Sequence, residues 1–477
     1  MRKLLEKWNK MPDATKSSIA FMMSSFIARG ISFLVTPIFT RIIPSEQYGI
    51  ITTYNSWVSI IEVFAVLGLT SAGVFNVGMK DHKEDRDQFI SSILILCNIT
   101  TVAVFGIIFI LKIPFGENFI LPPGLLIVML IHFLFNPATI FWITRQRYEY
   151  KYKLPFIITL VSNVLAQTVS IICLLNIETP NQGSLRIWTN TISLLFVQVP
   201  VYIILLKRGK TYVSIPIWKD TLVFSLPLIP HYLAQHVMAS SDRIMISNLY
   251  SNTGAAIYGV VANISMISTI IWNAVNASLI PYTYEKVEQN RSREINKIVI
   301  PLLLFYATIC VGVTLIAPEI LMILAPEEYY GGIYAVPPIA SMVFVSALYS
   351  IYANIEFYHK KSKNIAVCTI VAASTNVGLN YIFIPMYGYV AASYTTLISE
   401  VILVIMHYIG SRKCHKDNFY NDTVIFGITV ILIGACLVCN LLYANIYLRY
   451  SIVLVILLIL VFKRKYIINK YQEIKNK

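Results

Sequence analysis

The sequence predicts an all-α, polytopic membrane protein with about 14 transmembrane helices. Three observations support this class: the composition, the lengths of the apolar segments, and the alternation of basic residues between them. Of the 477 residues, 57% are hydrophobic and 13% are charged, whereas soluble globular chains are typically about 25% charged. Mean hydropathy is +0.67. The chain is therefore expected to reside in the cytoplasmic (inner) membrane as a multi-pass protein.

The apolar segments are long enough, or nearly so, to cross a bilayer as helices. A hydrocarbon core of ~30 Å needs ~17–25 helical residues, and only the last segment falls clearly short. We place the predicted spans at 17–43, 50–78, 89–111, 120–143, 154–177, 187–206, 221–249, 256–284, 299–324, 334–357, 365–384, 389–409, 423–442 and 447–462.

Basic residues alternate across these segments. From the N-terminal tail onward, every second connection contains 5, 3, 4, 4, 4, 3, 3 and 6 Lys or Arg residues. The intervening connections contain only Arg41, Lys112, Arg186 and Arg449. Because basic residues near span ends remain cytoplasmic, both termini are expected in the cytoplasm. This distribution explains the net charge of +14 by topology and anionic lipid, so no nucleic-acid partner is expected.

The sequence lacks the features that are usual in membrane enzymes. The connections are too short to form a soluble catalytic domain, and the chain has no phosphate-binding G-x-x-x-x-G-K-[ST]. The D-x-D sequence Asp85-Arg86-Asp87 lies in a charge-rich connector and is interpreted as a solvated loop. The seven cysteines suggest neither a disulfide framework nor a metal site. We therefore expect a transporter without a cofactor or a metal ion, and not an enzyme.

An internal repeat predicts two lobes. Tyr48-Gly49 follows the first span, and Tyr258-Gly259 follows the seventh, 210 positions later. Polar residues of spans 5 and 11 match at an offset of 213: Asn163 with Asn376, and Gln167 with Asn380. Each copy has six spans, an even number, so both copies enter the membrane in the same sense. The repeat therefore predicts a pseudo-two-fold axis along the membrane normal.

The chain divides accordingly into six parts. They are a cytoplasmic N-terminal tail (1–16), an N-terminal lobe of spans 1–6 (17–206), a cytoplasmic linker (207–220), a C-terminal lobe of spans 7–12 (221–409), two additional spans (410–462) and a cytoplasmic C-terminal tail (463–477).

Charged residues inside the predicted spans are candidates for function, because a charge in the hydrocarbon region should face protein or a water-filled cavity. Arg29 lies mid-way along span 1, and Glu62 on span 2 is its alternative, purely structural partner. Asp242 and Arg243 lie on span 7, which Pro227 and Pro230 should kink. Glu400 lies mid-way along span 12 and could pair internally or bind a coupling ion. The other candidates are span residues with hydrogen-bonding side chains, namely Asn55, Ser59, His236, Thr269, Asn273 and Asn276.

The densest cytoplasmic basic patch consists of Arg145, Arg147, Lys151 and Lys153. Topology alone explains these charges, although the patch would also suit an anionic lipid headgroup.

Several stretches together resemble a known family. They are Arg29-Gly30 through Pro37, Thr40 to Pro44, Tyr48-Gly49, Arg145 to Tyr148, Ser225 to His231, Ser241-Asp242-Arg243, Gly254, Tyr258-Gly259 and Pro318 to Tyr329. In order and spacing they resemble the Wzx-type polysaccharide flippases of the multidrug/oligosaccharidyl-lipid/polysaccharide (MOP) exporter superfamily. The resemblance covers about residues 15–460.

This resemblance implies a MATE-like fold of two six-helix lobes around a central cationic cavity, plus two extra C-terminal helices. The implied activity is the flipping of polyprenyl-diphosphate-linked oligosaccharide repeat units from the cytoplasmic to the outer leaflet by alternating access. The flipped units would serve O-antigen, capsule or exopolysaccharide assembly. The implied partners are the lipid-linked oligosaccharide, the bilayer, a polysaccharide polymerase and a chain-length regulator, and the protein is expected to be a monomer.

In this scheme Arg29 and Arg243 hold the diphosphate, because Arg geometry suits phosphate. The hydrogen-bonding residues at 55, 59, 236, 269, 273 and 276 contact sugar hydroxyls. Glu62, Asp242 and Glu400 balance the arginines or carry a coupling proton or sodium ion. Two alternatives remain: cation-coupled export of drugs or metabolites on the same fold, and an integral-membrane glycosyltransferase or polymerase. The sugar and the coupling ion are not specified by the sequence.

Overall fold

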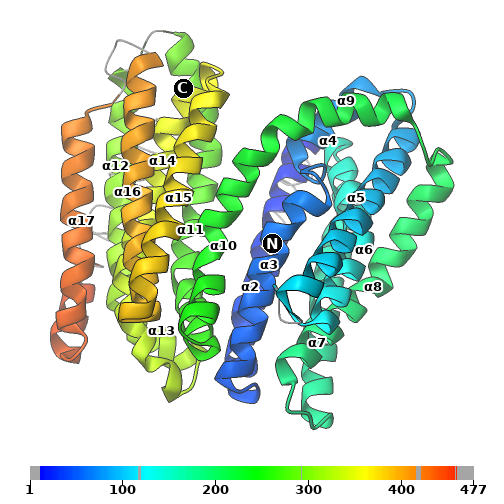
Figure 1. The fold of residues 1–477 in the computed structure, drawn as a ribbon. Coiled ribbons are helices and arrows are strands. Elements are labelled where there is room, and N and C mark those ends of the chain that lie inside the picture. Colours follow the sequence, from blue (N-terminus) through cyan, green and yellow to red (C-terminus); the bar gives the residue numbers. More distant parts are fainter. Residues whose placement is uncertain are drawn as a thin grey trace. The chain divides into compact units, whose positions relative to one another are not determined.

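The computed structural model describes residues 11–116, 120–289, 291, 293–414, 420–456 and 458, and every regular element in these ranges is helical (Figure 1). The expected fold class, an all-α polytopic membrane protein, is therefore confirmed. The first ten residues of the predicted N-terminal tail and all of the C-terminal tail (463–477) lie outside the described residues.

Eleven helices in the described ranges are long and apolar enough to cross a membrane. They correspond to predicted spans 1, 3 to 6 and 8 to 13. Span 9 is continuous only as far as Leu315 and is followed by a short separate helix. The other three predicted spans are interrupted or short. Span 2 is divided into two helices, span 7 is divided by a 3₁₀ turn, and span 14 begins with a short apolar helix, Ile446–Ile456, whose continuation is largely outside the described residues.

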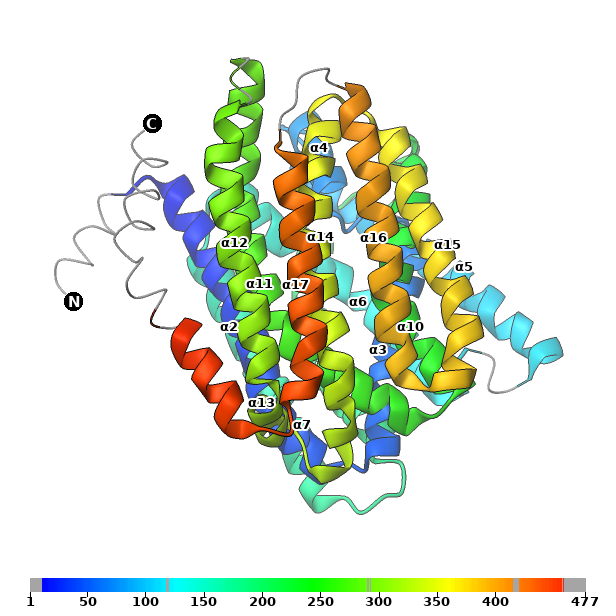
Figure 2. The same cartoon turned by 90° about the vertical axis from the view of Figure 1, so that its left-hand side faces the viewer.

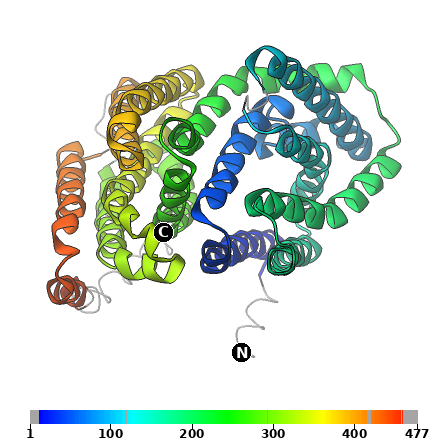
Figure 3. The same cartoon turned by 60° about the horizontal axis from the view of Figure 1, so that its bottom comes forward.

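The chain forms two compact units, Met1–Ser240 and Ser241–Lys477. Unit 1 contains α2 (Asp13–Ile42), α3 (Ser45–Ala65), α4 (Ala72–Asp81), α5 (Arg86–Phe115), α6 (Pro123–Tyr148), α7 (Lys153–Asn176), α8 (Gln182–Gly209), α9 (Ile215–Ser225), η1 (Leu226–Leu228) and the first part of α10 (Ile229–Leu249). Within it, α7 packs against both α2 and α8 (Figure 3). Its core is rich in buried aromatic rings, including the stacked pair Phe75 and Phe141, whose centroids are 5.2 Å apart.

Span 2 is divided at residues 66–71, which are not helical. Leu67 and Gly68 have φ angles of 51° and 66°, a left-handed region that ends a helix. In a membrane the released carbonyl groups need donors. The hydroxyl groups of Thr100 and Thr101 on α5 supply them by donating to the Ala65 carbonyl oxygen at 2.6 and 3.2 Å. The interruption is thus stabilised by the neighbouring helix.

Span 7 is interrupted where the sequence predicts a kink, at the 3₁₀ turn that contains Pro227. Side chains before and after this turn bind the interruption of span 2. The Ser225 hydroxyl donates to the Leu67 carbonyl oxygen, and the Tyr232 hydroxyl donates to Ser71 Oγ at 3.2 Å. A Cβ atom at Gly68 would lie 3.1 Å from the Tyr232 ring, so a glycine permits this close approach. The first part of span 7, as far as Tyr232, is therefore attached to the rest of unit 1.

Unit 2 contains the rest of α10, α11 (Asn252–Glu288), α12 (Arg293–Leu315), α13 (Ala317–Leu324), η2 (Glu327–Ala335), α14 (Val336–Tyr358), α15 (Ser362–Tyr387), α16 (Tyr389–Cys414) and α17 (Asp422–Leu442). The most deeply buried helix is α14, which packs against α11, α12, α16 and α17. Predicted span 13 is α17, which lies beside α12 and α14 (Figure 2).

The short helix that begins predicted span 14 is tied to unit 2 by an ion pair. The two terminal nitrogens of the buried Arg449 side chain each donate to a Glu319 carboxylate oxygen of α13 at 2.7 Å. Arg449 also donates to the Leu315 carbonyl oxygen at 2.8 Å, and the Tyr450 hydroxyl donates to Glu319 at 3.0 Å. This bidentate geometry is the stronger form of the Arg–carboxylate contact.

Gly410 of α16 is required by a buried pair at one end of unit 2. Glu356 and His407 are both fully buried, with the His407 Nδ1 atom 2.8 Å from Glu356 Oε2. Asn364 donates to the other Glu356 oxygen at 2.8 Å. A Cβ atom at Gly410 would lie 1.6 Å from that oxygen and 2.5 Å from the Asn364 amide nitrogen. A side chain added there would displace the Glu356 carboxylate and the Asn364 amide from these positions.

We expect Gly410→Ala to lower the thermal stability of the purified protein markedly, by about 3 kcal/mol or more, because it both overpacks the site and disrupts buried hydrogen bonds. Gly378→Ala on α15 is the matched control, since a Cβ there meets nothing within 4 Å and alanine is the better helix former. Equal melting temperatures for the two variants would contradict this packing.

Candidate functional site

A buried polar cluster surrounds Asp242 in unit 2. The side chain of Asp242 on α10 is 4% exposed. One carboxylate oxygen accepts hydrogen bonds from the Tyr258 hydroxyl of α11 at 2.7 Å and the Thr396 hydroxyl of α16 at 2.8 Å. The other accepts from the Asn380 amide of α15 at 2.7 Å. Four helices thus converge on one carboxylate.

Asn376 extends this cluster by one helical turn of α15. Its amide oxygen accepts hydrogen bonds from the Ser241 hydroxyl at 3.0 Å and from Asn380 at 3.2 Å. Its amide nitrogen lies 2.9 Å from Thr396 Oγ1. The Thr395 hydroxyl donates to the Asn380 amide oxygen. The cluster therefore contains several amide and hydroxyl oxygens beside the carboxylate.

The electrostatics of the Asp242 cluster are those of a carboxylate held by neutral donors. Within the described residues, no basic side chain forms an ion pair with Asp242. The neighbouring Arg243 guanidinium instead lies over the Tyr258 ring, 6.0 Å from its centroid. Burying a carboxylate without an opposite charge is costly even when it is hydrogen-bonded. The amide and hydroxyl oxygens around it are of the types that hard cations prefer as ligands.

The other charged residues predicted within spans have different surroundings. Arg29 is exposed on α2, and it forms no ion pair with Glu62 in the described part of unit 1. Glu62 on α3 instead accepts a hydrogen bond from Thr70 at 3.4 Å. In unit 2, Glu400 on α16 has one buried carboxylate oxygen that lacks a hydrogen-bond partner among the described residues. The structural alternative for Arg29, a pair with Glu62, is absent.

The predicted sugar-contacting residues differ in their surroundings. Asn55 and Asn273 are exposed, whereas Ser59, His236 and Thr269 are partly buried. Asn276 is engaged within unit 2, where it accepts a hydrogen bond from Asn354 at 3.1 Å. Asn276 can therefore reach a sugar only by giving up or sharing that bond.

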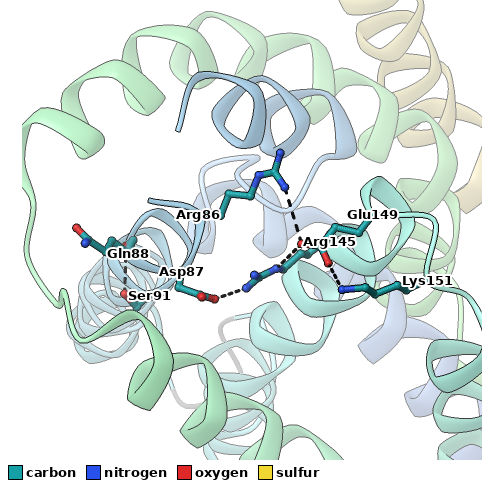
Figure 4. A network of polar contacts seen from close by, with 7 residues as sticks. All are labelled: Arg86, Asp87, Gln88, Ser91, Arg145, Glu149 and Lys151. Carbon is teal, nitrogen blue, oxygen red and sulfur yellow. Dashed lines mark hydrogen bonds and ion pairs between the residues drawn. The ribbon is translucent and has the colours of Figure 1, made fainter. Parts of the chain in front are cut away.

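Two of the four residues of the basic patch, Arg145 and Lys151, form ion pairs in the network of Figure 4. Arg145 at the end of α6 binds Asp87 at the start of α5, and its Nε atom lies 3.0 Å from Glu149. Lys151 lies 2.7 Å from the other Glu149 oxygen, and Arg86 lies 4.0 Å from Glu149. The network thus ties the start of α5 to the end of α6 within unit 1.

Headgroup capture by the whole patch is therefore less favourable than the sequence suggests. Arg147 is exposed and lies over the Phe21 ring, 4.8 Å from its centroid, and Lys153 is exposed. These two residues keep an accessible charge, while Arg145 and Lys151 share the carboxylates of the network. The pair between Arg145 and Asp87 was not predictable, because these two residues belong to different connections.

Glu149 makes this network sensitive to acid. Burial by itself would raise the pKa of its carboxyl group, but hydrogen bonds from Lys151 and Arg145 outweigh burial and hold the pKa below its ordinary value of 4.5. A carboxyl group whose pKa is depressed in the folded state stabilises the fold above its unfolded-state pKa and loses that contribution as the pH falls through the folded-state pKa.

We expect Glu149→Gln to lower the melting temperature at pH 7. This difference from the wild type should shrink as the pH falls below about 4.5 and disappear once the pH is below the depressed folded-state pKa. Melting curves at a series of pH values measure it. Glu178→Gln, at an exposed position, is the control. A Glu149→Gln deficit that persists unchanged in acid would show that the charge of Glu149 is not the cause.

Sequence reasoning also missed Arg186, which it placed in an outer connection. The structure places it on α8, where the side chain enters unit 1. Its terminal nitrogens donate to the Gln167 amide oxygen at 2.5 Å and to the Ser170 hydroxyl at 3.0 Å, both on α7. Its guanidinium lies 4.2 Å from the centroid of the Phe39 ring on α2. The repeat signal at Gln167 is the one clue to this site in the sequence.

A family model described as polysaccharide biosynthesis protein matches residues 14–287, more than half of the 477 residues. The chain belongs to this family. Among its relatives is protein 1 of the Lsg locus of Haemophilus influenzae, which is 22% identical over 413 residues, covering 83% of this chain and 98% of that protein.

Solved structures agree on the fold. An inward-facing MATE-family multidrug resistance transporter of the MOP superfamily is 14% identical and has a TM-score of 0.56, covering 81% of this chain and 94% of its own. A MOP superfamily transporter from Pyrococcus furiosus is 16% identical with the same TM-score, covering 84% of this chain and 96% of its own. The family and the fold of MOP transporters, which the motifs indicated, are confirmed; the cargo is not given by these likenesses.

Proposed function

We propose that this protein flips polyprenyl-diphosphate-linked oligosaccharide repeat units from the cytoplasmic to the outer leaflet for surface polysaccharide assembly. The observation that carries this proposal is the combination of membership in a polysaccharide biosynthesis family with the fold of a transporter superfamily. A polysaccharide pathway requires its lipid-linked intermediates to cross the membrane, and a chain with many spans and short connections suits that step.

The negative charge of the proposed cargo would explain why arginine residues lie within predicted spans. A diphosphate linkage carries about two negative charges, and an unpaired charge in the hydrocarbon region costs several kcal/mol. We assign its binding to Arg29 of unit 1 and Arg243 of unit 2, through charge-assisted hydrogen bonds. The exposure of Arg29 and its lack of an ion pair with Glu62 support this assignment, because its guanidinium is not held by that carboxylate.

The sugars need weaker and less specific contacts. Asn55, Ser59, His236, Thr269 and Asn273 offer neutral hydrogen-bonding groups, which can contact hydroxyl groups without fixing one sugar identity. Arg147 and Lys153 are the two members of the cytoplasmic patch that we assign to the initial attraction of the anionic headgroup, since the network of Figure 4 engages the others.

We assign the coupling ion to the Asp242 cluster. Its carboxylate is buried and surrounded by amide and hydroxyl oxygens, and every hydrogen-bond donor that it has among the described residues is neutral. A proton or sodium ion would neutralise it. Glu62 and Glu400 are secondary candidates for charge balance, and the buried Glu400 oxygen that lacks a partner is consistent with a protonated carboxyl group.

A second candidate function is cation-coupled export of drugs or metabolites, which the MATE-family neighbours favour by fold alone. The basic span residues disfavour cationic drugs. A deletion strain distinguishes the two functions. Flipping predicts that lipid-linked oligosaccharide accumulates on the cytoplasmic leaflet and that surface polysaccharide disappears, whereas export predicts increased drug sensitivity with normal surface polysaccharide.

A further inference from the structure

The two units contain buried clusters built on corresponding positions of the repeat, but with charges of opposite sign. At the offset of 210, Tyr48 corresponds to Tyr258 and Arg186 to Thr396; at 213, Gln167 corresponds to Asn380. The helices also correspond, because α8 follows and packs against α7 as α16 follows and packs against α15. The charged group is Asp242 in unit 2 and Arg186 in unit 1.

The corresponding side-chain amides, Asn380 on α15 and Gln167 on α7, form hydrogen bonds of opposite direction with the charged group. In unit 2, the Asn380 amide nitrogen donates to the Asp242 carboxylate at 2.7 Å. In unit 1, the Gln167 amide oxygen accepts from the Arg186 guanidinium at 2.5 Å. A carboxylate can only accept and a guanidinium can only donate, so partner chemistry fixes these orientations. One scaffold therefore holds a negative charge in one unit and a positive charge in the other.

The groups around Arg186 are of the kinds that hold a cation. They are an amide oxygen, the Ser170 hydroxyl at 3.0 Å and the face of the Phe39 ring at 4.2 Å, and the last is a cation–π contact. The Thr189 hydroxyl supports Ser170 at 3.1 Å. No carboxylate forms an ion pair with Arg186 in the part of the chain that the structure describes. A free cation approaching this cluster would meet a fixed guanidinium and be repelled.

We propose that Arg186 is a built-in cation of the unit 1 cluster, so that exchangeable cations bind only at the Asp242 cluster of unit 2. The second half of this statement rests on the proposed coupling at Asp242. One consequence is stoichiometric. Although the repeat supplies two clusters, a transport cycle exchanges one cation and not two.

The test removes the guanidinium of Arg186 by substitution and adds a free guanidinium compound to the solution. We expect purified Arg186→Ala to melt at a lower temperature than the wild type. We also expect methylguanidinium at about 10 mM, far below denaturing concentrations, to raise its melting temperature saturably by a few degrees. The wild type, whose site is filled, should show no such rise. Gln167→Leu added to Arg186→Ala removes the principal oxygen ligand and should abolish the rescue. Should Arg186→Ala fail to fold, Arg186→Gln is tested in the same way.

The same assay counts exchangeable cations. Sodium chloride is compared with choline chloride, at two pH values, for the wild type and Asp242→Asn. We expect Asp242→Asn to lose all saturable cation-dependent stabilisation. Retention of such stabilisation in Asp242→Asn would overturn the proposal, as would rescue by methylguanidinium that does not need Gln167, or an Arg186→Ala variant as stable as the wild type. Stabilisation of the wild type by inorganic phosphate that Arg186→Ala lacks would also overturn it, by assigning the site to an anion.

These outcomes separate the inference from the proposed function. If the wild type shows no cation dependence but methylguanidinium rescues Arg186→Ala, the coupling at Asp242 fails and the assignment of Arg186 stands. If cation binding at Asp242 is found but rescue is not, only the assignment of Arg186 fails.

Discussion

Replacing both Arg29 and Arg243 by alanine should abolish surface polysaccharide while leaving the protein folded in the membrane. Each charge-assisted hydrogen bond contributes about 1.5–3 kcal/mol, so each single substitution should lower transport by about 10- to 100-fold and the double substitution by more. The measurements are surface polysaccharide in a complemented deletion strain and the amount of protein in the membrane fraction.

Two controls make this result interpretable. Arg29→Lys and Arg243→Lys keep the charge but lose the bidentate geometry, so they should restore transport in part. Arg147→Ala removes an exposed arginine in the last turn of α6 and should have a much smaller effect, because we assign to Arg147 only the first encounter with the headgroup. Full transport by the double alanine variant would refute the assignment of the diphosphate to these residues.

Replacing Asp242 should have the second largest effect, and the nature of the replacement should matter. Asp242→Asn preserves the shape of the side chain and an oxygen acceptor for Tyr258, so the fold should persist while cation dependence is lost. Asp242→Ala removes the carboxylate that accepts hydrogen bonds from Tyr258, Asn380 and Thr396. Thr396 and Asn380 have other acceptors, the Ala392 carbonyl oxygen at 2.7 Å and Asn376 at 3.2 Å. The Tyr258 hydroxyl would lose its acceptor, at a cost of about 1–3 kcal/mol.

We therefore expect Asp242→Ala to be both inactive and less stable, and Asp242→Asn to be inactive but close to the wild type in melting temperature. Tyr258→Phe removes the donor and retains the ring, and it should perturb cation affinity with little loss of stability. Transport by Asp242→Asn that still responds to an imposed cation gradient would show that the coupling ion binds elsewhere, with Glu400 the next residue to replace.

Much of the fold followed from the sequence because membrane insertion imposes a simple rule on it. A helix that crosses lipid must satisfy its own backbone hydrogen bonds and be largely apolar along its length. The limits of each span can therefore be located in the amino-acid sequence. The exceptions include spans 2, 7 and 9, which are divided. At span 2, hydrogen bonds from Thr100 and Ser225 to backbone carbonyl oxygens compensate for the break. Those donors lie far away in the sequence, so only the kink at Pro227 could be predicted.

The candidate site was less predictable because its partners come from different helices. Asp242 was identified by its charge within a span, and Asn376 and Asn380 by the repeat. Neither signal indicates that Asn380 donates to Asp242. Arg186 was assigned to a connection because α8 begins five residues before the apolar segment, at Gln182. Its partners on α7 and α2 are identifiable only in three dimensions.

The most direct test of the central claim uses purified protein in proteoliposomes with a polyprenyl-diphosphate-linked oligosaccharide incorporated in the membrane. Accessibility of the oligosaccharide to an enzyme added outside reports its movement between leaflets. We expect the wild type to accelerate this movement well above protein-free liposomes and the Arg29→Ala/Arg243→Ala variant to leave it unchanged. Protein that leaves the glycolipid in its original leaflet, but extrudes a cationic dye in exchange for sodium ions or protons, would contradict the account and establish the exporter alternative.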